Sequence, residues 1–332
     1  MALKLFERRR LDRAGHPVQS PEGLVTMADA LRIARADRTW WDGDPVHVPL
    51  PVAGIISDAY AALRTPVMHA PVPDTLAPGD PWTANSRYTA PEGCTGQGFF
   101  PLDIDATKLS WKERHAHIPP EWRNNYAPSG QSHTPEDSTR ITPATDTPEQ
   151  EHTTHLSVVD HKGNAVSMTN TLGLYFGTGV YSEGVFYNSA ADNFGTGFGT
   201  IRGSGRTANS STAPSILLSG NEVALVVGSP GSTRIPPTIA QVIAHVLLFN
   251  IHPSEAMRMP RMFPHIYSRD IELERGFSTE ALEGLHMRGY RVVPRNYPMD
   301  MYFGGVQLIR VLPDGTRIGA TDPRRDGAAA GY

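Results

Sequence analysis

The sequence contains a single cysteine, Cys94, which excludes an internal disulfide and a cysteine-based metal cluster. It also has little net charge, because 34 acidic side chains nearly balance 30 basic ones, and nucleic acid and anionic membranes are therefore poor candidates for partners. No apolar run approaches the length of a membrane span, and residues 1–10 lack the apolar core of a signal peptide. As written, the chain is expected in the cytoplasm; if its start is truncated, a periplasmic or secreted location stays open.

Motifs for metals and cofactors are missing as well. The thirteen histidines include no His-Glu-x-x-His pattern, so we expect surface or hydrogen-bonding histidines and no metal site. The glycine-rich residues 195–199 lack the preceding strand and following helix of a nucleotide-binding loop, and no Gly-x-Ser-x-Gly elbow occurs. We therefore expect no cofactor.

The residues that are present predict a mixture of helices and strands. With 39% hydrophobic residues among 332, the chain is long enough to bury a substantial core. Apolar spacing and capping residues predict helices at about 26–38, 57–63, 239–249 and 278–285, and paired strands at 215–218 with 223–227 and at 306–311 with 317–320. Between these blocks, residues 82–126 are rich in aromatic side chains and predict irregular packed structure. Residues 128–149, rich in Pro, Ser and Thr, predict a mobile linker.

The most informative stretch is residues 152–172, which reads as two strands joined by a polar turn. With a loop from Asp160 to Asn164, a simple hairpin register sets Thr153 opposite Thr171. One face then carries only small polar groups and histidine, while the other carries the apolar residues Leu156, Val158, Val166, Met168 and Leu172. This pattern predicts that two threonine hydroxyls meet across the strands.

A threonine hydroxyl is a poor nucleophile until a base removes its proton and neighbouring groups orient it. Thr171 is in a position to orient Thr153. The alternative is an ordinary strand pair, because threonine is a favourable strand residue.

Two further segments carry polar or backbone groups suited to a site. The turn 228–234 follows an apolar strand and can direct successive backbone N–H groups at one point, as an oxyanion hole requires, or can simply connect a strand to a helix. Ser210 and Ser211 can bind a carboxylate through hydroxyl and amide donors, or can form an ordinary turn.

Taken together, these segments resemble the γ-glutamyltranspeptidase family. The resemblance is carried by the motifs at 153–160, Thr171, 176–179, 210–211 and 228–231, by the ending at 322–332, and by Ala36-Asp37-Arg38 and Gly43-Asp44-Pro45. It covers essentially all of 153–332, which corresponds to the family's small subunit. Residues 30–63 look like the late part of its large subunit.

The resemblance implies an α+β fold, the four-layer αββα sandwich of N-terminal-nucleophile hydrolases, here lacking the first part of the large subunit. It divides the chain into a truncated large-subunit-like segment, 1–152, and a catalytic segment, 153–332. The precursor would cut itself between His152 and Thr153, and the freed amino group would serve as base for the Thr153 hydroxyl. Thr171 and the amides of Gly231 and Ser232 would support the reaction, with no metal or cofactor.

Several positions depart from the family pattern. Gly173, Ala190 and Asn193 stand where the family usually has asparagine, an acid or amide, and aspartate to hold the glutamyl group, whereas Ser210 and Ser211 are kept. Loss of such polar groups can cost orders of magnitude in specificity. Ser232 replaces a glycine, and the arginine that the family uses on the substrate carboxylate lies in the missing part.

Three hypotheses follow from this comparison. The first is a self-processing threonine acyl-transfer enzyme resembling γ-glutamyltransferase or glutathione hydrolase, acting on a small amide with water or an amine as acceptor. The second is a relative with a non-glutamyl substrate, similar to cephalosporin acylases or to the C–C bond hydrolases of alkylproline antibiotic pathways. The third is a catalytically silent fragment that acts as a subunit, with a complementing large-subunit chain as partner.

Overall fold

The computed structural model describes residues 1–43, 50–82, 84, 151–194 and 207–331. The predictions of packed irregular structure across 85–126 and of a mobile linker at 128–149 fall outside these ranges. The segment that contains the Gly195 to Gly199 repeat also falls outside them.

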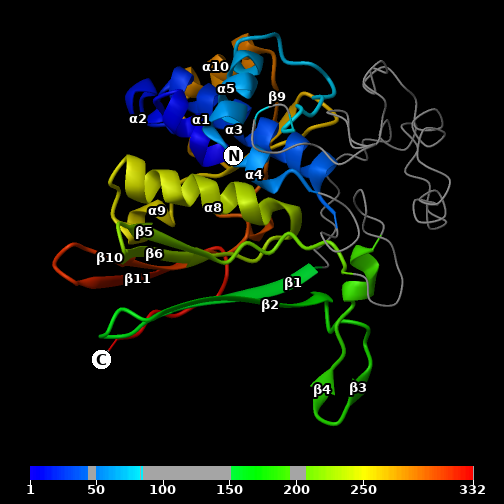
Figure 1. Cartoon of the computed structure of the whole chain (residues 1–332), viewed down its shortest axis with the longest axis vertical. Helices are drawn as coiled ribbons and strands as arrows, with labels where there is room; N and C mark the ends of the chain where they lie inside the picture. Colours follow the sequence, from blue (N-terminus) through cyan, green and yellow to red (C-terminus); the bar gives the residue numbers. More distant parts are fainter. Residues whose placement is uncertain (44–49, 83, 85–150, 195–206, 332) are drawn as a thin grey trace.

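The described residues form an α+β fold in three layers (Figure 1). A four-stranded antiparallel sheet in the order β11-β10-β6-β5 occupies the middle. Helix α8 packs on one face of it, and the β1-β2 hairpin crosses the other face, where it contacts β5, β6 and β10. These strands are β1 (Glu151–Val159), β2 (Ala165–Leu174), β5 (Ser215–Ser219), β6 (Glu222–Gly228), β10 (Gln307–Val311) and β11 (Arg317–Thr321).

The helices gather on one side of the central sheet (Figure 1). They are α1 (Ala2–Arg8), α2 (Leu11–Ala14), α3 (Pro21–Trp41), α4 (Val52–Ile55), α5 (Asp58–Arg64), α8 (Ile235–Ile243), α9 (Pro253–Ala256) and α10 (Thr279–Arg288). A π-helical turn, η6 (Ala244–Leu248), continues α8. The helices expected near 57–63, 239–249 and 278–285 are confirmed; the second begins earlier than expected, at Ile235, with prolines in its first turn, and Gly289 in a left-handed conformation ends the third.

The predicted start of the first long helix is wrong. Thr26 lies inside α3 and is buried, while Ser20 caps the helix by accepting a hydrogen bond from the Gly23 N–H at 3.1 Å. Pro21 follows at the first helical position, where its missing N–H costs nothing. The Ser-Pro pair was therefore the start signal, and α1 at the N-terminus was not predicted.

A second sheet was also not predicted. It has the order β7-β8-β9 and comprises β7 (Met262–Pro264), β8 (Asp270–Leu273) and β9 (Arg291–Pro294). These strands have no more than four residues each, too short for alternation to be legible. They join α3 and α10 in one hydrophobic core, which combines residues 5–76 with residues 240–290.

The C-terminal motif is a buried charge network. Arg324 forms ion pairs with Glu274 and Asp322, and Asp322 also pairs with Arg261. The two arginine side chains beside Asp322 hold the pKa of that carboxyl below its usual value against the opposing effect of burial. The network ties residues 322–324 to the residue before β7 and to the residue after β8, so this part of the C-terminal motif has a structural role.

Candidate functional site

The hairpin places two threonine hydroxyls in contact. Thr153 on β1 pairs with Thr171 on β2, and the Thr153 hydroxyl donates a hydrogen bond to the Thr171 Oγ1 atom at 3.0 Å. The predicted register is confirmed down to the turn, where the Asp160 carboxylate accepts the N–H groups of Lys162 and Asn164 at 2.8 and 2.9 Å. The turn therefore fixes the register that brings the threonines together.

A β-bulge interrupts this ladder at the predicted cleavage site. His152 pairs with Gly173 while Thr153 pairs with Thr171, so Leu172 is an extra residue opposite the His152–Thr153 peptide. The Gly173 N–H turns back to donate to the Thr171 Oγ1 atom at 2.9 Å. The Thr171 oxygen thus accepts from both Thr153 and Gly173, and the ladder is irregular at the His152–Thr153 peptide.

Gly173 lies against Ser189 at this bulge. Its φ angle is +78°, and a Cβ atom there would lie 2.3 Å from the Ser189 Oγ atom. Ser189 is buried and ties the bulge together, since its hydroxyl accepts the Leu174 N–H at 2.9 Å and donates to the Leu172 carbonyl at 3.2 Å. Any side chain at position 173 would therefore displace Ser189.

Ala190 and Asn193 follow directly, as the first and last residues of the 3-10 helix η4 (Ala190–Asn193). The structure thus places Gly173 in the bulge and Ala190 next to Ser189, which is bonded to the bulge, while Asn193 ends the same 3-10 helix. Sequence reasoning missed Ser189, because a lone serine after an exposed Tyr-Asn pair gives no signal of this contact.

The turn after β6 is strained in the manner of a functional site. Gly231 has a φ angle of +129° and Ser232 one of +54°, a left-handed conformation that is uncommon outside glycine. Ser229 braces the turn by accepting the Gly305 N–H at 3.2 Å and donating to the Pro230 carbonyl at 2.6 Å. Within the described part of the chain, the N–H groups of Gly231 and Ser232 donate no hydrogen bond, which leaves both available to an oxyanion.

The predicted carboxylate-binding pair lies next to the long helix. Ser210 is exposed and Ser211 half-buried, and the Ser210 hydroxyl lies 2.8 Å from the Thr212 Oγ1 atom. Arg38 near the end of α3 donates to the Ser210 carbonyl at 3.0 Å and to the Asn209 Oδ1 atom at 3.3 Å. Arg38 was noticed only as part of the Ala-Asp-Arg motif, and its contact with this segment links the two halves of the chain.

The two faces of the hairpin differ in burial. The polar face points inward, where Ser157 donates to the Gln307 carbonyl and Ser167 to the Val227 carbonyl, each at 3.2 Å. His155, which pairs with Thr169 at the next inward-facing position, is 6% exposed, and burial lowers the pKa of its ring to about 4. The apolar face is turned outward, with Val158 47% and Val166 49% exposed.

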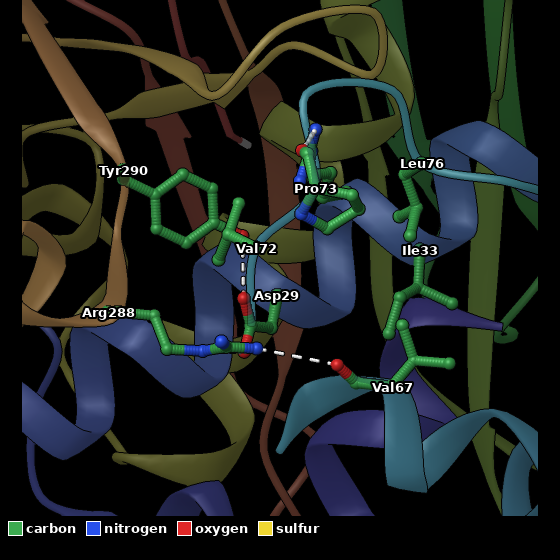
Figure 2. Close-up of a pocket in the computed structure, with 9 residues that line it drawn as sticks. Asp29, Ile33, Val67, Val72, Pro73, Leu76, Arg288 and Tyr290 are labelled. Carbon is green, nitrogen blue, oxygen red and sulfur yellow. Dashed lines mark hydrogen bonds and ion pairs between the residues drawn. The ribbon is translucent and has the colours of Figure 1, made fainter. Parts of the chain in front are cut away.

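A pocket between α3 and the segment that follows α5 offers no comparable chemistry (Figure 2). Its polar groups already pair with one another: the Tyr290 hydroxyl donates to Asp29 at 2.6 Å, and Arg288 donates to the same carboxylate at 2.9 Å. Arg32 is bound to four backbone carbonyls. The polar residues of this pocket therefore have a structural role.

The described residues hold no cluster of three or more His, Cys, Asp or Glu side chains able to bind a metal ion. Among the same residues, no helix combines the length and the apolar character that crossing a membrane demands. The bulge with its two threonines and the strained turn form the candidate site, because the His155 ring on the threonine face of β1 lies against Gly228, the last residue before that turn.

Comparison with known proteins identifies the family. Residues 107–332 match the sequence profile described as Gamma-glutamyltranspeptidase. This chain belongs to the γ-glutamyltranspeptidase family.

Relatives in the family include the glutathione hydrolase proenzyme of Escherichia coli K12, 31% identical over 328 residues. That match covers 94% of this chain but 45% of the E. coli protein, so the chain spans less than half the length of this relative. The capsule biosynthesis protein CapD proenzyme of Bacillus anthracis is 34% identical over 183 residues, which cover 54% of this chain and 33% of that protein. The acylase ACY 1 proenzyme of Pseudomonas sp. SE83 is 27% identical, with 93% of this chain and 43% of that protein covered.

A solved structure shares the fold along the whole chain. Cephalosporin acylase from Bacillus halodurans superposes with a TM-score of 0.68 at 18% identity, over 100% of this chain and 49% of that one. The fold described above therefore corresponds to about half of that solved structure.

Proposed function

We propose that this member of the family is a self-processing acyl-transfer enzyme in which Thr153 is the nucleophile. The observation that carries the proposal is the 3.0 Å contact between the Thr153 hydroxyl and the Thr171 Oγ1 atom beside a bulge in the ladder. A nucleophile needs a neighbour that fixes its rotamer and lone pairs. Thr171 supplies this, and its own oxygen is held by the Gly173 N–H.

The first reaction is an internal cleavage. The Thr153 oxygen attacks the His152 carbonyl carbon, its proton passes to the departing nitrogen, and the peptide becomes an ester. Water then hydrolyses the ester, which leaves a carboxylate on His152 and a free amino group on Thr153. The bulge leaves this peptide outside the regular ladder, so little pairing must be broken.

Turnover uses the new amino terminus. An α-amino group has a pKa of about 7.7 to 8.0 and can accept the proton of the Thr153 hydroxyl near neutral pH. The hydroxyl oxygen attacks the substrate amide, and the amides of Gly231 and Ser232 stabilise the resulting oxyanion. The amine product leaves, and water or a second amine removes the acyl group from Thr153.

Intact-mass analysis of the purified chain tests the proposal. We expect two fragments that meet between His152 and Thr153, and a Thr153→Ala variant that stays whole. The matched control is Thr154→Ala, because Thr154 is exposed on the opposite face of β1 and should leave cleavage unchanged. A parent chain that never cleaves would favour the silent-subunit hypothesis instead.

A non-glutamyl substrate is the second candidate, and the bulge favours it. The space where a side chain at position 173 would project is filled by Ser189, so no amide group can reach the substrate from there. Ala190 and the neutral Asn193 add no charge for an ammonium group. We expect the processed enzyme to hydrolyse glutaryl p-nitroanilide at least as fast as γ-glutamyl p-nitroanilide, whereas strong preference for the γ-glutamyl compound with competition by glutamate would exclude this candidate.

The fourth layer of the family sandwich belongs, in this proposal, on the outer face of the β1-β2 hairpin. Four large apolar side chains are exposed there, namely Leu156, Val158, Val166 and Met168. A patch of this kind on a two-stranded sheet marks a surface that another element covers. The occupant we propose is a polypeptide segment that supplies the remaining half of the family fold.

A further inference from the structure

His155 lies on the same side of β1 as the predicted nucleophile, two residues away. Its ring is nearly fully buried between the hairpin and the central sheet. The Nδ1 atom lies 2.8 Å from the Thr169 Oγ1 atom, and the Nε2 atom lies 3.1 Å from the Ser157 Oγ atom. Both partners belong to the hairpin, so the ring is fixed relative to Thr153 and Thr171.

Opposite the ring, the central sheet has a notch at Gly228. A Cβ atom at this position would lie 2.2 Å from the His155 Cε1 atom and 2.3 Å from Nδ1. Gly228 does not have a positive φ angle, so its backbone conformation is open to any residue. Glycine is needed here because the imidazole ring touches the backbone of β6.

Gly228 is also the last residue before the strained turn. Ser229 is fully buried and bonded to Gly305, and the Gly304 backbone packs so closely on the Pro230 carbonyl that a Cβ atom at position 304 would overlap it. These close contacts leave the turn little room to absorb a shift of β6. A displacement at Gly228 moves the Gly231 and Ser232 amides with it.

We infer that His155 is a positioning residue: by seating its ring in the Gly228 notch it sets the distance between the Thr153 hydroxyl and the amides of Gly231 and Ser232. This inference rests on the proposed function. The ring nitrogens of His155 face hydroxyl groups, so the ring acts as a neutral spacer and takes no proton from the substrate. Misplacement of reacting groups by about 1 Å can cost about 100-fold in rate.

The test is a size exchange across the contact. His155→Ala removes the spacer, Gly228→Ala adds a methyl group that collides with it, and the double variant places the methyl group in the vacated space. We expect each single change to slow cleavage at His152–Thr153 by about 10- to 100-fold. We expect the double variant to be faster than the product of the two losses predicts, because neighbouring sites couple. His155→Asn should recover part of the rate, since its amide can still reach Thr169.

Controls separate this role from general destabilisation. Gly319→Ala adds a methyl group within a regular strand, at 3.1 Å from the Ala329 Cβ atom, and should cleave at the parent rate. All rates are measured where urea curves show each variant folded, and kcat and KM for γ-glutamyl p-nitroanilide are measured on processed protein. A spacing role lowers kcat and leaves KM nearly unchanged.

The outcomes are distinct. If the parent cleaves and Gly228→Ala cleaves equally fast, or if the single losses simply multiply, the inference is overturned and the proposed function stands. If the parent does not cleave at all, both are overturned.

Discussion

The two faces of the β1-β2 hairpin contrast sharply. The inner face, against the central sheet, carries hydroxyls and a histidine, and His155 is 6% exposed. The outer face carries aliphatic side chains, and Val166 is 49% exposed. This reverses the usual arrangement of a sheet, in which the apolar face packs on the core and the polar face meets water.

The reversal shows that two different interactions hold the layers. Hydroxyl groups of the inner face bond to backbone carbonyls of β6 and β10, as Ser167 does with Val227 and Ser157 with Gln307. Such bonds contribute about 1 kcal/mol each and fix geometry more strictly than apolar contact does. The inner face therefore gains a defined position for Thr153, and the outer face is left to be covered by other residues.

The largest effect is expected from Thr171→Val, which alters the inner face at the site itself. The change keeps the shape but removes the acceptor of the Thr153 hydroxyl. A hydrogen bond to a group that gains charge contributes about 1.5 to 3 kcal/mol, so cleavage should slow by about 10- to 100-fold. A time course of intact mass measures it, with Thr154→Val on the outer face as control. Cleavage at the parent rate would show that Thr171 does not orient Thr153.

A pH-dependent loss of stability is the next effect, and it also belongs to the inner face. Burial lowers the pKa of His155 to about 4, so the folded chain keeps the ring neutral while the unfolded chain binds a proton below pH of about 6.5. The contribution of the neutral ring to the free energy of unfolding is complete above pH of about 6.5. It is lost as pH falls toward 4, and the free energy of unfolding decreases by up to about 1.4 kcal/mol per pH unit.

Urea unfolding at several pH values measures this slope. His245, fully buried with its pKa lowered to about 3, acts in the same direction, so the parent alone does not isolate His155. The difference in slope between the parent and His155→Asn isolates the contribution of His155. Identical slopes in the two proteins would mean that His155 is accessible to protons in the folded state.

Sequence reasoning reached part of this picture. Alternation and the Asp160 to Asn164 turn predicted the register and the Thr153–Thr171 contact, because a hairpin register is a local property. The same alternation could not show which face is buried, since that depends on the layer that lies opposite. The alternation is equally compatible with the polar face or the apolar face packing against the central sheet.

Other features were beyond the sequence for related reasons. The contact of His155 with Gly228 joins residues 73 positions apart across two sheets, and a single glycine at a strand end gives no hint of what approaches it. The contact of Ser189 with the bulge likewise could not be predicted from the sequence. The start of α3 was misplaced because Thr26 fits a capping pattern, whereas the interior of the fold buries it and Ser20 takes the cap.

The smallest effects come from a pair of neighbouring alanine variants, and they test the contrast between the faces directly. Ser167→Ala removes the hydroxyl bond to the Val227 carbonyl and should lower the free energy of unfolding by about 1 kcal/mol. Val166→Ala trims a half-exposed side chain on the opposite face and should cost less than about 1 kcal/mol. Once a polypeptide covers the outer face, the loss at Val166 should rise to about 2 kcal/mol, as for a core residue, while the loss at Ser167 should not change. If Val166→Ala lowered the free energy of unfolding of the uncovered chain by about 2 kcal/mol, the outer face would already be packed, and the layer proposed to lie there would have no surface to occupy.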